Sequence, residues 1–140
     1  MSTCFLGIGS NQRNPARQLR IALKFIRGLP TSSMLRVSSF YWTKAWGYQG
    51  QQVFCNAVVE IKTRLSPTLL LKACQDIETR QGRIRRRKWG PRVIDIDILI
   101  YDTRKIQTET LVIPHPWILQ RDFVMKPLQE ICPFFHKFLI

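Results

Sequence analysis

Hydrophobic and polar positions alternate, or recur at helical spacing, through the first hundred residues of this chain. An apolar run over residues 3–9 ends in Gly9-Ser10-Asn11 and predicts a strand followed by a turn. Residues 34–43 are rich in Val, Ser, Phe, Tyr and Trp, and residues 53–63 alternate apolar with polar positions. These two segments predict a pair of antiparallel strands, and residues 93–101 predict a further strand.

Two segments between these strands have helical periodicity. From Pro15 to Arg27 the apolar side chains recur every three or four residues, with Asn14 as the expected N-cap and Gly28 as the stop. A second helix is expected to begin at Ser66-Pro67 and to end at Gly82, with apolar residues along one side. The predicted order is therefore β-α-β-β-α-β.

That order predicts an α+β fold of the ferredoxin-like, or split βαβ, type: an antiparallel sheet with both helices on one face. The remaining third of the chain is less regular. It contains a weak strand pattern up to Val112, a helical turn or two over residues 118–127, and another turn over residues 127–131. The apolar tail, residues 134–138, either docks or frays. At 140 residues we expect one domain spanning residues 1–140.

The charge of the chain indicates which class of ligand to expect. Lys and Arg outnumber Asp and Glu by 22 to 9, so an anionic ligand is expected: nucleic acid, a membrane surface or a polyphosphate. No apolar run approaches the ~20 residues that span a bilayer, and no secretory signal is visible, so we expect a cytoplasmic protein. The four cysteines form no C-x-x-C pair. Cys4, Cys55 and Cys74 are expected to be buried free thiols.

The most informative segment is cationic and runs directly into a strand with two carboxylates. Residues 83–92 are R-I-R-R-R-K-W-G-P-R, and Asp95 and Asp97 follow within V-I-D-I-D-I-L-I. Residues two apart on a strand share a face, with Cα atoms ~6.6 Å apart. Two such carboxylates can hold magnesium, which also binds substrate phosphates. Alternatively they are two acids on a solvent-facing edge, and the cationic run is a solvated charge cluster.

Other candidates are more ambiguous. His115, between two prolines, could contact phosphate or simply structure a turn. Phe123 follows Arg121 by two residues, and an aromatic side chain of this kind is more often a core residue than a ligand platform. Gly7, Gly9 and Ser10 form neither a P-loop nor a dinucleotide-binding motif.

Several motifs occur together in an order that resembles one family. They are G-I-G-S-N at residues 7–11, S-S-F-Y-W-T at 38–43, F-C-N-A-V at 54–58, the helix end from Ile77-Glu78 to Gly82-Arg83, W-G-P-R-V-I-D-I-D-I at 89–98, P-H-P at 114–116 and R-D-F at 121–123. From Phe5 to about Pro133 the chain resembles 6-hydroxymethyl-7,8-dihydropterin pyrophosphokinase of folate biosynthesis.

The resemblance implies a ferredoxin-like α/β/α fold, ATP as co-substrate, two magnesium ions, and transfer of diphosphate from ATP to the pterin hydroxymethyl group. It implies Asp95 and Asp97 as metal ligands and Arg83 and Arg92 as catalytic phosphate clamps. It places the pterin against Thr43, Phe54, Asn56, Trp89 and Phe123. It places ATP against Gln75, Glu78, Arg85, Ile98, His115 and Arg121. A monomer without nucleic-acid or membrane partners is expected.

The chain departs from the family pattern in the loop after the second helix, which is one residue shorter and leaves the alignment of residues 85–88 open. It has Thr110 where some members carry arginine, and Phe54 where many carry tyrosine. Two rivals from the residues alone remain. A nucleic-acid-binding domain explains the arginines and Trp89 but not the acids. A metal-dependent nuclease or phosphohydrolase explains the acids and arginines but not the two phenylalanines.

Overall fold

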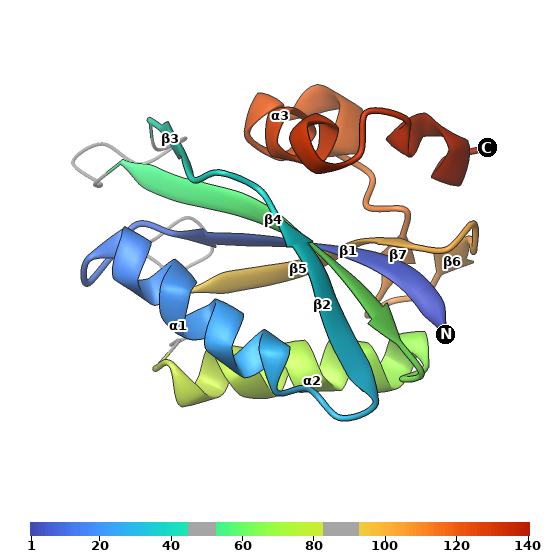
Figure 1. Ribbon diagram of the computed structural model, residues 1–140, viewed down its shortest axis with the longest axis horizontal. Coiled ribbons are helices and arrows are strands. Elements are labelled where there is room, and N and C mark those ends of the chain that lie inside the picture. The colour runs from blue at the N-terminus through green and yellow to red at the C-terminus, as the bar shows by residue number, and fades with distance from the viewer. Residues whose placement is uncertain (45–52, 83–92) are drawn as a thin grey trace.

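The computed structural model describes residues 1–44, 53–82 and 93–140 (Figure 1). Their elements, in chain order, are β1 (Ser2–Ser10), α1 (Pro15–Arg27), β2 (Ser32–Val37), β3 (Tyr41–Thr43), β4 (Phe54–Thr63), α2 (Pro67–Arg80), β5 (Asp95–Tyr101), β6 (Ile106–Gln107), β7 (Val112–Ile113), a 3₁₀ turn (Ile118–Gln120), α3 (Asp122–Ile131) and a second 3₁₀ turn (Phe135–Phe138). The predicted β-α-β-β-α-β order is confirmed, with the second strand divided into β2 and β3.

The sheet is antiparallel throughout the described residues. Its strands lie in the order β2-β4-β1-β5, and β3 pairs with the other end of β4. Helices α1 and α2 cover one face, and α3 with the C-terminal turn covers the other (Figure 1). The layers are therefore α/β/α, and the predicted ferredoxin-like class is confirmed. Strand β5 is at one edge of this sheet.

Each face has its own apolar core. Toward α1 and α2, the core includes Leu6, Ile8, Leu19, Cys74 and Ile96. Toward α3, the core is smaller. Its buried residues are Phe5, Val58, Leu99, Ile100, Ile118, Val124, Leu128, Ile131 and Phe135. Phe135 is fully buried, so the apolar tail docks rather than frays.

The helix boundaries follow the predicted caps. The Asn14 side chain accepts a hydrogen bond from the Arg17 N–H, and the Ser66 hydroxyl accepts one from the Leu69 N–H. A proline follows each cap, where its missing N–H removes no helical bond. After α2, Gly82 adopts φ +90°, a left-handed conformation that glycine allows without steric cost.

One long strand was predicted over residues 34–43, and this was wrong in detail. The Ser38 side chain interrupts it, because its hydroxyl accepts the Val58 N–H at 2.9 Å in a buried position. That side-chain bond replaces a main-chain one, so the ladder with β4 breaks between β2 and β3. Glu130 of α3 then fixes the junction by accepting hydrogen bonds from the Ser39 N–H and hydroxyl and from the Tyr41 hydroxyl.

The separate helical turns predicted on either side of Pro127 were also wrong. Helix α3 runs continuously from Asp122 to Ile131 with Pro127 inside it. Proline costs a helical hydrogen bond, but Pro127 is buried in the core that α3 forms with the sheet. The carbonyl oxygen of Ile131, at the helix end, accepts a bond from Arg36 at 2.9 Å, which further ties α3 to β2.

Strand β5 contains a bulge. Phe5 pairs with Ile100 but Leu6 pairs with Ile98, so Leu99 is an extra residue. Before the bulge, Gly7 faces Asp97 and Gly9 faces Asp95 across the strand pair. These residues share the face that α3 covers, since Gly7 and Gly9 alternate with Leu6 and Ile8 of the opposite core.

The cysteines are free, and burial raises the pKa of Cys4 to about 12 and that of Cys55 to about 11. The prediction of buried free thiols is confirmed for Cys4, Cys55 and Cys74, and neutral thiols of this kind are poor nucleophiles. Within residues 1–44, 53–82 and 93–140, no helix has the length and apolar character needed to cross a membrane.

Candidate active site

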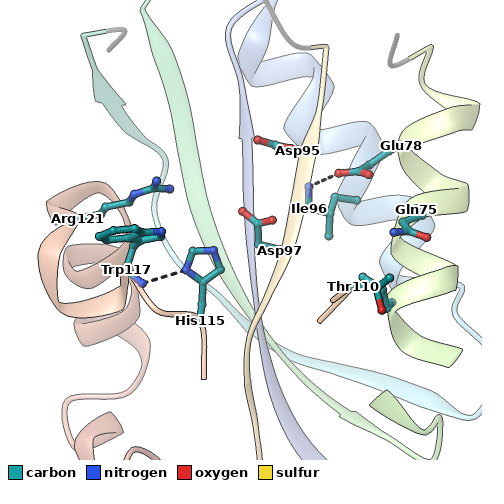
Figure 2. Close-up of a pocket in the computed structure, with 10 residues that line it drawn as sticks. Gln75, Glu78, Asp95, Ile96, Asp97, Thr110, His115, Trp117 and Arg121 are labelled. Carbon is teal, nitrogen blue, oxygen red and sulfur yellow. Dashed lines mark hydrogen bonds between the residues drawn. The ribbon is translucent and has the colours of Figure 1, made fainter. Parts of the chain in front are cut away.

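A pocket with a volume of about 380 Å³ lies along the outer edge of β5. Helix α2 forms one wall, the β5 carboxylates form the floor, and the segment between β7 and α3 forms the other wall (Figure 2). Its lining residues are Leu71, Gln75, Glu78, Asp95, Ile96, Asp97, Thr110, His115, Trp117 and Arg121. The pocket therefore brings together six predicted site residues from three separate parts of the chain.

Asp95 and Asp97 point to the same side of β5, as their spacing predicts (Figure 2). Asp95 is half-buried and Asp97 is exposed, so both carboxylates can be reached from the pocket. The described residues contain no group of three or more His, Cys, Asp or Glu side chains able to hold a metal ion alone. Two carboxylates nevertheless fit magnesium, because that ion commonly takes its other ligands from water and substrate phosphates.

Glu78, in the wall formed by α2, also has a structural role. Its side chain is only 3% exposed, and its carboxylate accepts the Ile96 N–H at 2.8 Å. Ile96 lies between the two aspartates on the edge strand, so this bond ties α2 to the strand between its two carboxylates (Figure 2). The sequence pointed to Glu78 as a nucleotide contact, and the structure shows in addition that it positions the β5 edge.

His115 stands on the opposite wall and is held by its main chain and its ring. Its N–H donates to the Leu99 carbonyl at 2.8 Å, and its Nδ1 accepts the Trp117 N–H at 3.3 Å. Burial and then the nearby Arg121 guanidinium lower the pKa of His115, while Asp95 acts in the opposite direction. The imidazole is therefore neutral at pH 7, and with Nδ1 accepting, the proton resides on Nε2.

Arg121 immediately precedes α3 and lies beside two aromatic rings. Its Cζ is 5.7 Å from the centroid of the Trp117 ring and 5.5 Å from that of Phe123. Trp117 was not predicted as a site residue, nor was the role of Thr110 in the lining. The available signal for Trp117 was an aromatic residue two positions after His115, in a turn too short to bury it.

The residues implied for the pterin form a second group next to the pocket. The Asn56 amide donates to the Thr43 hydroxyl at 3.3 Å across the β3–β4 pair. Asn56, Gly9 and Asp95 are cross-strand partners in one row of the sheet. Neighbouring strands are ~4.8 Å apart, so Asn56 and Asp95 lie about 10 Å apart with a glycine between them. Phe54 and Phe123 are both half-buried.

The structure gives two further outcomes for the predicted site residues. Ile98 is only 4% exposed and belongs to the core beneath α1 and α2, so its side chain does not line the pocket. Arg83, Arg85, Trp89 and Arg92 lie outside the described residues. Their roles stay predictions.

The chain is similar to known proteins of one family. Residues 5–133 match the family model described as 7,8-dihydro-6-hydroxymethylpterin-pyrophosphokinase. A Haemophilus influenzae protein named 2-amino-4-hydroxy-6-hydroxymethyldihydropteridine pyrophosphokinase is 47% identical over 131 residues, covering 94% of this chain and 82% of that protein. A Bacillus subtilis protein of the same name is 42% identical, covering 91% and 77%.

Longer proteins also contain a related part. The chain is 40% identical to a segment of the Schizosaccharomyces pombe folic acid synthesis protein fol1, covering 92% of this chain and 18% of that one. The crystal structure of Plasmodium falciparum HPPK-DHPS with pteroate superposes with a TM-score of 0.71 at 14% identity, covering 92% of this chain and 38% of that one. That likeness supports the fold. The matched family model and the identities above 40% together show that this chain belongs to the 7,8-dihydro-6-hydroxymethylpterin-pyrophosphokinase family.

Proposed function

We infer that this protein is an ATP-dependent diphosphokinase that transfers diphosphate from ATP to 6-hydroxymethyl-7,8-dihydropterin in folate biosynthesis. The hydroxymethyl oxygen attacks the β-phosphorus and loses its proton. The bond between the β-phosphorus and the oxygen that bridges it to the α-phosphorus breaks, and AMP leaves with that oxygen. The observation that carries this inference is the placement of Asp95 and Asp97 opposite His115 and Arg121 in one pocket of a chain from this family.

Diphosphate transfer requires alignment and charge stabilisation more than covalent help from the protein. Asp95 and Asp97 are proposed to hold two magnesium ions, which would neutralise phosphate charge during transfer. On the facing wall, Arg121 offers several N–H donors in one plane to phosphate oxygens. Neutral His115 offers its Nε2–H in the same pocket without adding a charge.

The nucleotide is proposed to lie along the α2 wall. Gln75 lines the pocket from this helix and can donate to the nucleotide through its amide. Glu78 acts there mainly by keeping β5 in place, because its carboxylate accepts the Ile96 N–H. Any contact by Ile98 would involve its main chain, since its side chain is buried in the core.

The pterin is proposed to lie above the row Asn56–Gly9–Asp95. The Asn56 amide and the Thr43 hydroxyl supply polar groups for the ring edge, and they are already oriented by their mutual hydrogen bond. Gly9 leaves the sheet surface between amide and carboxylate without a side chain, which suits a flat ring. Phe54 and Phe123 are proposed to stack on the two ring faces. The hydroxymethyl group would then point toward the phosphates held at Asp95.

The segment 83–92 is proposed, by resemblance to the family, to complete the site. Arg83 and Arg92 would clamp the transferred diphosphate, Arg85 would contact the nucleotide, and Trp89 would cover the pterin. We further propose one pyrophosphokinase domain over residues 1–140, acting as a cytoplasmic monomer without nucleic-acid or membrane partners.

The test is a reconstituted reaction with ATP, magnesium and 6-hydroxymethyl-7,8-dihydropterin. We expect AMP and pterin diphosphate in equal amounts, and neither product when the pterin or the metal is left out. Absence of AMP from a folded, ATP-binding preparation would contradict the proposal. Cleavage of nucleic acid without ATP would instead support the nuclease alternative, and salt-sensitive RNA binding without turnover would support the nucleic-acid-binding one.

A further inference from the structure

Trp117 is a large exposed side chain in the wall of the pocket. Its side chain is 49% exposed, but both of its main-chain groups form hydrogen bonds. Its N–H donates to His115 Nδ1 at 3.3 Å, and its carbonyl accepts the Gln120 N–H at 3.1 Å. The next residue, Ile118, is 2% exposed in the core toward α3. The indole is thus carried by an anchored turn and faces Arg121 (Figure 2).

Arg121, in the wall of the pocket, is positioned among the described residues by aromatic rings and not by a carboxylate. In the described parts of the chain the one ion pair joins Arg36 to Glu60, and Arg121 has no carboxylate within ion-pair distance. Its guanidinium instead lies 5.7 Å from the Trp117 ring and 5.5 Å from the Phe123 ring. Aromatic faces attract a guanidinium through their negative quadrupole.

The distinction matters for binding an anion. A carboxylate would occupy the N–H donors of Arg121 and cancel its charge. An aromatic ring stacked on the guanidinium does neither, because the donors point outward in the guanidinium plane. Stacking therefore orients the cation and leaves its donors for phosphate oxygens.

We propose that Trp117 is a positioning residue that acts on the nucleotide through Arg121, by holding the guanidinium against its ring in the orientation that receives phosphate. The proposal rests on the proposed function, in that it takes the phosphates of ATP to be the anion. Phe123 holds the guanidinium as well, so Arg121 is in contact with one ring of the nucleotide pocket and with one ring proposed for the pterin.

The first experiment measures binding of magnesium with α,β-methylene-ATP, whose α–β linkage cannot be cleaved, by isothermal titration calorimetry. We expect Trp117→Ala to weaken binding by about 2- to 10-fold, the range of a cation–π contact at a partly exposed site. Trp117→Phe, which keeps a ring but no indole N–H, should remain within about 2-fold of wild type. Leu119→Ala is the matched control, because Leu119 lies in the same turn, is 54% exposed and does not line the pocket.

The second experiment is a double-mutant cycle with Arg121→Ala. If Trp117 acts through Arg121, Trp117→Ala should have no further effect in the Arg121→Ala background. The same loss in both backgrounds would overturn the proposal, since Trp117 would then contact the nucleotide itself. A Trp117→Phe protein as weak as Trp117→Ala would overturn it too. Binding is measured without turnover, so a chain that binds the analogue but makes no AMP would reject the proposed function and leave this inference tested separately.

Discussion

Gly9 offers a sharp test of the sheet surface on which the proposed pterin site rests. A Cβ added at this position would lie 2.6 Å from Asn56 Oδ1 and 3.6 Å from the Cys55 carbonyl oxygen. A contact of 2.6 Å is too short for carbon and oxygen, so something must move. Rotating the Asn56 amide would not relieve the clash, because its nitrogen is as large as its oxygen and the residue is 8% exposed.

The cost of Gly9→Ala follows from three terms. Overpacking in a close-packed region costs about 1–3 kcal/mol. Displacing Asn56 adds about 1 kcal/mol if its bond to Thr43 is lost. The lower entropy of the unfolded alanine variant returns about 0.4–1 kcal/mol. The free energy of unfolding should therefore fall by about 1–3 kcal/mol, and Tm by roughly 4–12 °C for a protein of this size.

Gly28→Ala is the matched control. Its Cβ would meet only the Phe25 and Lys24 carbonyl oxygens, at 3.6 and 3.7 Å, and its φ of −88° suits alanine. Its Tm should equal or exceed that of wild type. Thermal unfolding by circular dichroism measures both effects, and steady-state kinetics should show KM for the pterin rising more than KM for ATP in Gly9→Ala. A Gly9→Ala protein with wild-type Tm and wild-type pterin KM would refute the account of this surface.

Three further predictions follow from the same contacts. Asp97→Asn should lower kcat by at least about 100-fold while leaving Tm within a few degrees of wild type, because the change removes a metal ligand at an exposed position; kinetics near wild type would exclude that role. Ser38→Ala should lower the free energy of unfolding by about 1–3 kcal/mol, since the buried Val58 N–H loses its acceptor, and urea titration against the exposed Ser33→Ala would detect it. Folding lowers the pKa of His115, so the stability that this residue contributes is complete above the unfolded pKa of ~6.5 and is lost as the pH falls through the folded pKa. The Tm of His115→Gln should therefore fall less than the Tm of wild type between pH 7.5 and pH 5.5. An equal fall in both proteins would contradict this role of His115.

The sequence predicted most of the fold because its local signals agree with its tertiary contacts. Asn14-Pro15 and Ser66-Pro67 cap their helices as expected, and the strands of the β-α-β-β-α-β core match the predicted order. The division of β2 from β3 was missed because the deciding event is a hydrogen bond between the Ser38 side chain and a partner twenty residues away. Helix α3 was divided wrongly because local propensity treats Pro127 as a break, whereas packing against the sheet outweighs that preference.

The sequence predicted those features of the candidate site that depend on the spacing of residues within one strand. It did not predict contacts between residues that only the folded chain brings together. The spacing of Asp95 and Asp97 placed both carboxylates on one side of β5. No local pattern could show that Glu78 accepts a hydrogen bond from the Ile96 N–H, because the two residues meet only when α2 packs along the edge of β5. Trp117 was missed for the same reason, since its partner Arg121 is near in sequence but meets the ring only through the turn at residues 118–120.

The bulge at Leu99 has a consequence for how one strand serves two environments. A regular strand would send Ile100 to the same side as Ile96 and Ile98. The extra residue reverses this alternation, so Ile100 joins Leu99 on the side of the two carboxylates, while Tyr101 crosses over and donates its hydroxyl proton to the Leu65 carbonyl. The face of β5 that carries the two carboxylates is therefore polar and open to the pocket at Asp95 and Asp97, and apolar and buried at Leu99 and Ile100. Without Leu99 the strand would alternate regularly and Ile100 would still face the α3 core, so the bulge adds one more buried side chain to that core and leaves the two carboxylates at the polar end.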